Sequence, residues 1–279
     1  MIDYRSVVLA GGGSRTFWHV GFWQSVEEPL GLRPTQIAAV SAAAAMACAI
    51  LSRRGEQALG IFQAATRDNP KNAYWGNLFG KEPVFPHERM YRRALLQFVD
   101  AEALALLHAG PDVRVLLAHP PRWLGARAGA AVAMAAYNLE KKLRKNVHPR
   151  LAQQLGFQPE VVSIRECATP EALADLILCS SCTPPMTTLQ RWKGRAVLDG
   201  GVVDNVPVCA LEGEPGATLV LLSRRYPKLP VHAGRTYVQP SAPIPVSAWE
   251  YTNPGGLQAT FDLGRRDGDA FARQATRAH

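Results

Sequence analysis

Near its beginning the chain reads VVLAGGGSR over residues 7–15, and this stretch decides the fold class. The four apolar residues predict a short buried strand, and the three glycines after them predict a tight loop. Residues 17–26 then carry apolar side chains at helical spacing, until the turn at Pro29, Leu30 and Gly31. A strand, a glycine loop and a helix in this order are typical of the first unit of an α/β fold.

Residues 37–51 repeat this order with a second strand and helix. Residues 37–40 predict the strand, Ser41 follows directly, and an alanine-rich helix continues to about residue 51. Later patterns predict strands at residues 113–118, 160–164, 196–198 and 218–222, and helices at residues 88–108, 127–145, 170–179 and 256–273. This alternation predicts a mostly parallel sheet covered by helices.

The 279 residues contain no long polar linker, which favours a single domain over residues 1–279. Its motifs lie within residues 7–208, and residues 217–276 are expected to add C-terminal strands and a helix. With 47% hydrophobic and 19% charged residues, the composition excludes disordered, collagen-like and coiled-coil proteins.

The charge balance favours anionic partners. Lysine and arginine number 31 against 23 acidic residues, for a formal net charge of +8, which suits a phospholipid surface or nucleic acid. Basic pairs are scattered without a helix-turn-helix or aromatic RNA-binding pattern, so we expect no nucleic-acid partner. We see no export signal and no apolar run long enough to span a bilayer, and we expect a cytoplasmic protein, with peripheral membrane contact left open.

The cysteines do not predict a metal site. Cys179 and Cys182 form a C-x-x-C pair, but no second pair or histidine cluster completes a set of four ligands. We expect buried free thiols and predict neither metal nor cofactor.

The first candidate motif is the glycine loop, formed by Gly11, Gly12, Gly13, Ser14 and Arg15. Backbone N–H groups in such a loop can converge on one anionic atom, as in an oxyanion hole. A dinucleotide fingerprint would need a third glycine at position 16, where the chain has Thr16. A glycine turn without chemistry stays open. Arg15 could fix the loop through a backbone carbonyl or an acid, or lie on the surface.

The second motif is a serine between a strand and a helix, with small residues around it: Ala39, Val40, Ser41, Ala42 and Ala43. This is the layout of a nucleophile elbow, in which the hydroxyl stands at the tip of the strand. A serine at a helix start is also an ordinary N-cap, and both interpretations stay open here.

The third motif is Asp199, Gly200 and Gly201, directly after the strand predicted at residues 196–198. Two glycines allow a sharp turn beside the acid, and a turn without chemistry stays open as the alternative. At the carboxyl end of a parallel strand, Asp199 would share one edge of the sheet with Ser41 and the glycine loop.

Together, the early G-G-G-x-R loop, the serine elbow about thirty residues later and the late D-G-G motif resemble patatin-like phospholipases. The likeness covers residues 7–208, and WEYTNP at residues 249–254 and LGRRDG at 263–268 are similar to C-terminal segments of bacterial members. Thr16, Ala39 and Ala43 stand where the family usually has glycine. The resemblance implies a three-layer α/β fold, with a mostly parallel central sheet and helices on both faces.

The resemblance also implies a function. Ser41 would be the nucleophile, Asp199 the general base, and the glycine loop the oxyanion hole of a serine hydrolase. Its substrates would be fatty-acyl esters of lipids, as in a phospholipase A, lysophospholipase or lipase, and no cofactor would be needed.

Two other functions stay open at this point. A non-catalytic lipid-binding relative would account for the alanines around Ser41. The chain order Ser41, Asp199, His232 also matches an α/β-hydrolase triad, although that fold normally has several strands before the elbow.

Two segments could meet a membrane or cover the site. A helix with Ala128, Ala131, Val132, Ala135 and Leu139 on one face ends in the basic residues Lys141, Lys142, Arg144, Lys145 and Arg150. It could lie on an anionic membrane or pack on the sheet. Residues 69–86 could form a lid or a packed loop.

Overall fold

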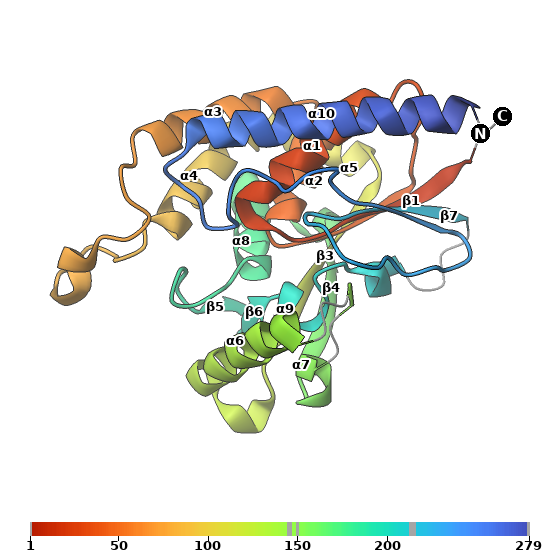
Figure 1. Ribbon diagram of the computed structural model, residues 1–279. Helices are drawn as coiled ribbons and strands as arrows, with labels where there is room; N and C mark the ends of the chain where they lie inside the picture. Colours follow the sequence, from red (N-terminus) through yellow and green to blue (C-terminus); the bar gives the residue numbers. More distant parts are fainter. Residues whose placement is uncertain (1, 144–146, 149–150, 212–215, 278–279) are drawn as a thin grey trace.

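The computed structural model describes residues 2–143, 147–148, 151–211 and 216–277, with the side chains of residues 136–143 left aside. Figure 1 shows a sheet crossing the middle of the molecule, with helices above and below it. This arrangement confirms the predicted three-layer α/β fold.

Five strands form the parallel part of the sheet, in the order β3-β2-β1-β7-β8. They are β1 (Tyr4–Leu9), β2 (Gln36–Val40), β3 (Asp112–His119), β7 (Ala217–Leu221) and β8 (Arg235–Val238). Because β1 and β2 are central and parallel, the segments that follow them leave the sheet at the same edge.

Three further strands are antiparallel: β4 (Gln158–Ser163), β5 (Gln190–Trp192) and β6 (Arg195–Asp199). Along one side of β3, β4 pairs with residues 114–119. On the other side, β2 pairs as far as Leu116, and β6 pairs with Leu117 and Ala118. Strand β6 therefore continues the edge of β3 at the point where β2 ends.

This pairing corrects the reason given for the position of Asp199. The sequence placed it at the carboxyl end of a parallel strand, but β6 runs antiparallel to β3. Its last residue, Asp199, pairs with Leu117, and the last residue of β2, Val40, pairs with Leu116. The two strand ends therefore meet from opposite directions.

Most helices cover one face of the sheet. In Figure 1 they lie above it: α1 (Phe17–Val26), α2 (Ala42–Leu51), α3 (Gly55–Arg67), α4 (His87–Phe98), α5 (Ala101–Ala109), α8 (Pro170–Ser180) and α10 (Pro254–Arg277). Below it lie α6 (Ala126–Leu143), α7 (Leu151–Gln154) and α9 (Gly201–Asp204). Strand β2 is buried on both sides, with Ile37 and Ala39 in the larger core and Ala38 and Val40 in the smaller clusters.

Short 3-10 helices connect several of these elements: η1 (Gly13–Thr16), η2 (Trp75–Phe79), η3 (Arg122–Leu124), η4 (Ile164–Glu166) and η5 (Val208–Leu211). Two of them lie in segments that the sequence singled out. Helix η1 begins within the glycine loop, and η2 lies within residues 69–86.

Some of the element bounds predicted from the sequence are wrong. The helix predicted at residues 88–108 is two helices, because Asp100 interrupts it and caps α5 by accepting a hydrogen bond from the Ala103 amide at 2.8 Å. The sequence pattern does not predict helix α3, which begins at Gly55. The predictions for residues 17–26 and 170–179 are confirmed by α1 and α8.

The C-terminal helix packs directly on the first helix. A Cβ atom on Gly264 would lie 2.2 Å from the Trp18 carbonyl oxygen, and one on Gly21 would lie 2.0 Å from that of Phe261. The Trp18 indole also donates a hydrogen bond to Asp267 at 2.7 Å. This close contact holds α1, and with it the end of the glycine loop, against α10.

The exposure of the apolar face of helix α6 bears on one of its two interpretations, packing on the sheet, and leaves contact with a membrane a prediction. Ala128, Ala131 and Ala135 are exposed, whereas Ala133 on another face is buried. The apolar face therefore does not pack on the sheet, and the basic cluster at Lys141, Lys142, Arg144, Lys145 and Arg150 lies outside the residues whose side chains are described. Among the helices described, none has the length and apolar character needed to cross a bilayer.

Candidate active site

Ser41 sits at a strained turn between β2 and α2. Its backbone has φ 57° and ψ −137°, a conformation that non-glycine residues rarely adopt. Its side chain makes no capping hydrogen bond to α2. Ser41 therefore occupies the N-cap position of α2 without capping the helix through its hydroxyl, and its positive φ at a strand-to-helix turn is a feature expected of a nucleophile elbow.

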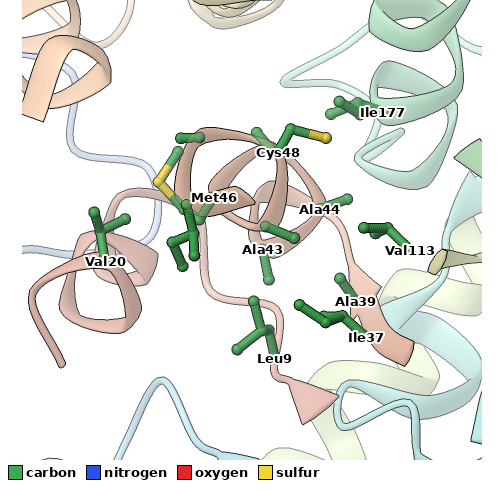
Figure 2. Packing of buried hydrophobic residues seen from close by; sticks show 14 of the residues in the cluster. Leu9, Val20, Ile37, Ala39, Ala43, Ala44, Met46, Cys48, Val113 and Ile177 are labelled. Atoms are coloured by element: carbon green, nitrogen blue, oxygen red, sulfur yellow. The ribbon is translucent and has the colours of Figure 1, made fainter. Parts of the chain in front are cut away.

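The two alanines beside the elbow are accommodated in the core. Ala39 and Ala43 are fully buried. Figure 2 shows them with Leu9 and Ile37 on the side of α2 that faces the sheet. The turn thus forms with a methyl group at each position, where the family usually has glycine.

A buried serine at the end of α8, Ser180, holds the elbow in place. Its hydroxyl accepts a hydrogen bond from the Ser41 amide at 2.8 Å and donates one to the Leu116 carbonyl of β3, also at 2.8 Å. Its own carbonyl accepts from the Gly200 amide at 3.3 Å. Ser180 therefore links the ends of β2 and β6 to β3, the strand with which both pair. No motif in the sequence singles out this residue.

The Asp199 carboxylate lies beside Ser41. It accepts hydrogen bonds from the Gly201 amide at 2.7 Å and the Thr183 hydroxyl at 3.4 Å. Burial raises the pKa of Asp199 to about 6, and these donors, together with a hydrogen bond from the Ser41 side chain, act to lower it. The carboxylate is thus a stronger base than an exposed aspartate and is still ionised at neutral pH.

The glycine loop follows β1 and approaches neighbouring backbone closely. Gly13 has φ +57°, and a Cβ atom there would lie 2.0 Å from the Ala248 carbonyl oxygen. The side chain of Arg15 donates from Nε to the Gly12 carbonyl at 3.1 Å, which is the loop-fixing contact that the sequence suggested. Only glycine satisfies both the angle and the space at position 13.

The five amides of this loop differ in what they bind. Those of Gly11, Ser14 and Arg15 donate to the carbonyls of Asn205, Ala248 and Gly12. Among the described residues, no acceptor is found for the amides of Gly12 and Gly13. Both of these glycines line the same cavity as Ser41.

Two further residues hold the glycine loop through the Gly11 carbonyl, and no motif in the sequence singles them out. Asn205 donates from its amide side chain to the Gly11 carbonyl at 3.0 Å, and the buried Ser223 hydroxyl donates to the same oxygen. Because each contact joins segments that are far apart in the chain, no local sequence pattern predicts it.

A cavity of about 440 Å³ lies over these groups, a size typical of small-molecule sites. Ser41, Asp199, Gly12, Gly13 and Arg15 line it, whereas Gly11 and Ser14 do not. The structure therefore brings all three sequence motifs to one space.

The cavity wall also carries polar groups that the sequence analysis did not select. The hydroxyls of Tyr91 and Ser181 are buried there without a hydrogen-bond partner among the described residues. The pKa of Tyr91 is raised well above its ordinary value by burial and, to a smaller extent, by the nearby Tyr251 and Asp199. The hydroxyl therefore keeps its proton at neutral pH.

Other candidates from the sequence lie elsewhere. His232 precedes β8, with its ring 6.5 Å from that of Tyr237, and it does not line the cavity. The structure does not bring it to Ser41 and Asp199. None of the five cysteines forms a disulfide bond with another described cysteine; four are buried, as expected, and Cys209 is half-buried.

Comparison with known proteins agrees with these motifs. A family model described as Patatin-like phospholipase matches residues 7–211. The chain is also similar in structure to VipD from Legionella pneumophila, with a TM-score of 0.48 and 12% sequence identity over 98% of this chain and 67% of VipD. No curated protein sequence matches the chain.

Replacing Ser180 with alanine tests the link between the strand ends. Ser180→Ala leaves the buried Ser41 amide without its acceptor, and we expect the free energy of unfolding to fall by about 1–3 kcal/mol in urea titrations. Ser52→Ala is a matched control, because the Cys48 carbonyl that binds the Ser52 hydroxyl also accepts the Ser52 amide. Equal losses in the two variants would contradict this role.

Proposed function

Because the chain belongs to the patatin-like phospholipase family, whose model matches residues 7–211, we propose that it is a serine hydrolase that cleaves fatty-acyl esters of lipids through Ser41 and Asp199. One observation carries the proposal: Ser41 and Asp199, whose side chains interact, line the same cavity as Gly12 and Gly13. A serine, a base and paired backbone donors in one cavity are the requirements of acyl transfer.

In the first step, the Ser41 oxygen attacks the ester carbonyl carbon while its proton passes to the Asp199 carboxylate. The negative charge that develops on the carbonyl oxygen is stabilised by the Gly12 and Gly13 amides. The bond to the alcohol then breaks, and the alcohol leaves with the proton held by Asp199. The acyl group remains on Ser41.

In the second step, water attacks the acyl-serine and gives a proton to Asp199. The proton returns to the Ser41 oxygen as the acyl bond breaks, and the fatty acid is released. The raised pKa of Asp199 supports this cycle, because a carboxylate with a pKa of about 6 binds a proton more readily than an ordinary aspartate.

The alternatives have less support. A Ser-Asp-His triad would need His232 in the cavity, where it is not found. A non-catalytic lipid-binding protein would have no need for the strained backbone at Ser41, which costs about 1–3 kcal/mol.

Substitution of the two proposed catalytic residues tests the function. With a p-nitrophenyl ester of a short fatty acid, we expect Ser41→Ala to lower kcat/KM by about 10³-fold or more, because the nucleophile is lost. We expect Asp199→Asn to lower it by about 10²- to 10⁴-fold, because no base remains for the serine proton.

His232→Ala is the control and should retain the wild-type rate. Equal rates for Ser41→Ala, Asp199→Asn and wild type would instead support a lipid-binding protein without catalysis. Loss of hydrolysis in a folded His232→Ala variant would support the triad.

We further propose that Tyr91 hydrogen-bonds to the oxygen of the departing alcohol. Its hydroxyl is protonated at neutral pH, lies near enough to Asp199 to sense the carboxylate charge, and has no acceptor among the described residues. The oxygen of the departing alcohol gains negative charge as the ester bond breaks, and it would accept a hydrogen bond from the Tyr91 hydroxyl. Ser181, whose side chain lies beside Tyr91 and acts to lower its pKa, would support the same oxygen.

Tyr91→Phe tests this role through its dependence on the leaving group. We expect kcat/KM for an alkyl ester to fall by about 10- to 100-fold, because a charge-stabilising hydrogen bond is lost. The p-nitrophenyl ester should be nearly unaffected, because p-nitrophenolate leaves without such help. Equal losses with the two esters would contradict contact with the leaving oxygen, while the function of Ser41 would still stand.

A further inference from the structure

Residues 74–85 form a loop that projects from the molecule and exposes large apolar side chains. Phe79 is 98% exposed, Trp75 68% and Leu78 59%. In Figure 1 the orange turn of η2 stands at the left, away from the sheet and beyond α4. Apolar side chains gathered in this way mark a surface that meets a partner.

Hydrogen bonds define the conformation of this loop, and they hold its apolar tip in an exposed position. The Tyr74 amide donates to the Val84 carbonyl at 2.8 Å and closes the loop at its base. The Asn77 side chain donates to the Pro83 carbonyl at 3.1 Å. At its beginning, Asn69 donates to the Tyr251 carbonyl at 2.8 Å. The tip is therefore held out in one shape, with its ends fixed to the body.

A continuous row of rings connects this loop to the cavity. The rings of Trp75 and Phe85 are 5.8 Å apart, and those of Phe85 and His87 are 6.2 Å apart. His87 in turn lies 5.8 Å from Trp249 and 4.4 Å from Tyr251. Since His87, Trp249 and Tyr251 line the cavity, the exposed tip and the cavity wall are parts of one apolar path.

The charges around the tip suit an anionic surface. Lys71 and Lys81 are exposed on either side of Trp75, Leu78 and Phe79. Glu82 is paired with Arg89 at 2.9 Å, which removes most of its effect on an approaching anion. Residues 67–93 contain six basic and three acidic side chains. Tryptophan, phenylalanine and leucine flanked by lysines form a typical interfacial anchor.

We propose that the loop of residues 74–85 is the membrane-docking element of this protein, and that it inserts Trp75, Leu78 and Phe79 into an anionic phospholipid bilayer. Lys71 and Lys81 then face the lipid head groups. The choice of a lipid partner rests on the proposed function. The row of rings from Trp75 to His87 then joins the inserted tip to the wall of the cavity that Ser41 lines.

This assignment differs from both expectations for residues 69–86. The segment does not cover the cavity, since none of its residues lines it, and its tip is not packed on the body. The sequence suggested a different membrane contact, the basic helix at residues 127–150. The loop instead combines exposure, charge and a connection to the site.

Vesicle co-sedimentation of the full chain tests the proposal. The probes are vesicles of phosphatidylcholine alone and vesicles of equal phosphatidylcholine and phosphatidylglycerol. We expect the wild type to bind the anionic vesicles more tightly, and L78S/F79S to bind them about 10- to 100-fold more weakly, because two inserted side chains are lost. K71Q/K81Q should lose most of the preference for anionic lipid.

Val231→Ser is the matched control, because Val231 is 95% exposed but lies before β8, outside the loop. It should bind as the wild type does. L78S/F79S should keep its rate on a soluble short-chain ester and its unfolding midpoint, and should lose hydrolysis of vesicle phospholipid only.

The outcomes separate this proposal from the proposed function. Vesicle binding that depends on Leu78 and Phe79 supports docking even if no ester is hydrolysed. Undiminished binding by L78S/F79S overturns docking while leaving catalysis intact. If the wild type binds neither kind of vesicle, the proposal is wrong and a protein partner becomes the occupant of the loop.

Discussion

The candidate site depends on how one edge of β3 is shared between two strands. Strand β2 occupies this edge up to Leu116, and β6 takes it over from Leu117 in the opposite direction. The chain therefore leaves both strands at the same point, with Ser41 on one side and Asp199 on the other. The Ser180 hydroxyl fixes the junction by bonding to Ser41 and Leu116 at once. A strained backbone at Ser41 persists because these contacts determine it.

Local sequence patterns predicted the separate motifs of the site. They did not predict the hydrogen bonds between distant segments that hold these motifs together. The loop at Gly13 and the elbow at Ser41 are strand ends, and strand ends have short sequence signatures. The direction of β6 could not be predicted, because it depends on which edge of β3 is free. Ser180, Asn205 and Ser223 act through single hydrogen bonds between distant segments, which leave no periodicity in the sequence.

The exposed side chains show the same limit of prediction from local sequence patterns. Lys141 and its neighbours are a run of charge that is visible in the sequence, and they left open a membrane contact or a helix packed on the sheet. Exposure of Phe79 and Leu78 is a property of the folded chain, because an apolar residue in a loop can be buried or free. The residues that line the cavity were found partly from the sequence and partly from the structure. Its catalytic candidates came from motifs, whereas Tyr91 emerged only from its burial without a partner.

The central claim is that Ser41 is a nucleophile whose base is Asp199. It is tested most directly by labelling the protein with a fluorophosphonate across a pH series and mapping the modified peptide. We predict modification at Ser41, at a rate that rises as the pH passes upward through about 6, because Asp199 accepts the proton only when ionised. The Asp199→Asn protein should label far more slowly. Labelling at another residue, or equal labelling of Ser41 in Asp199→Asn, would contradict the account.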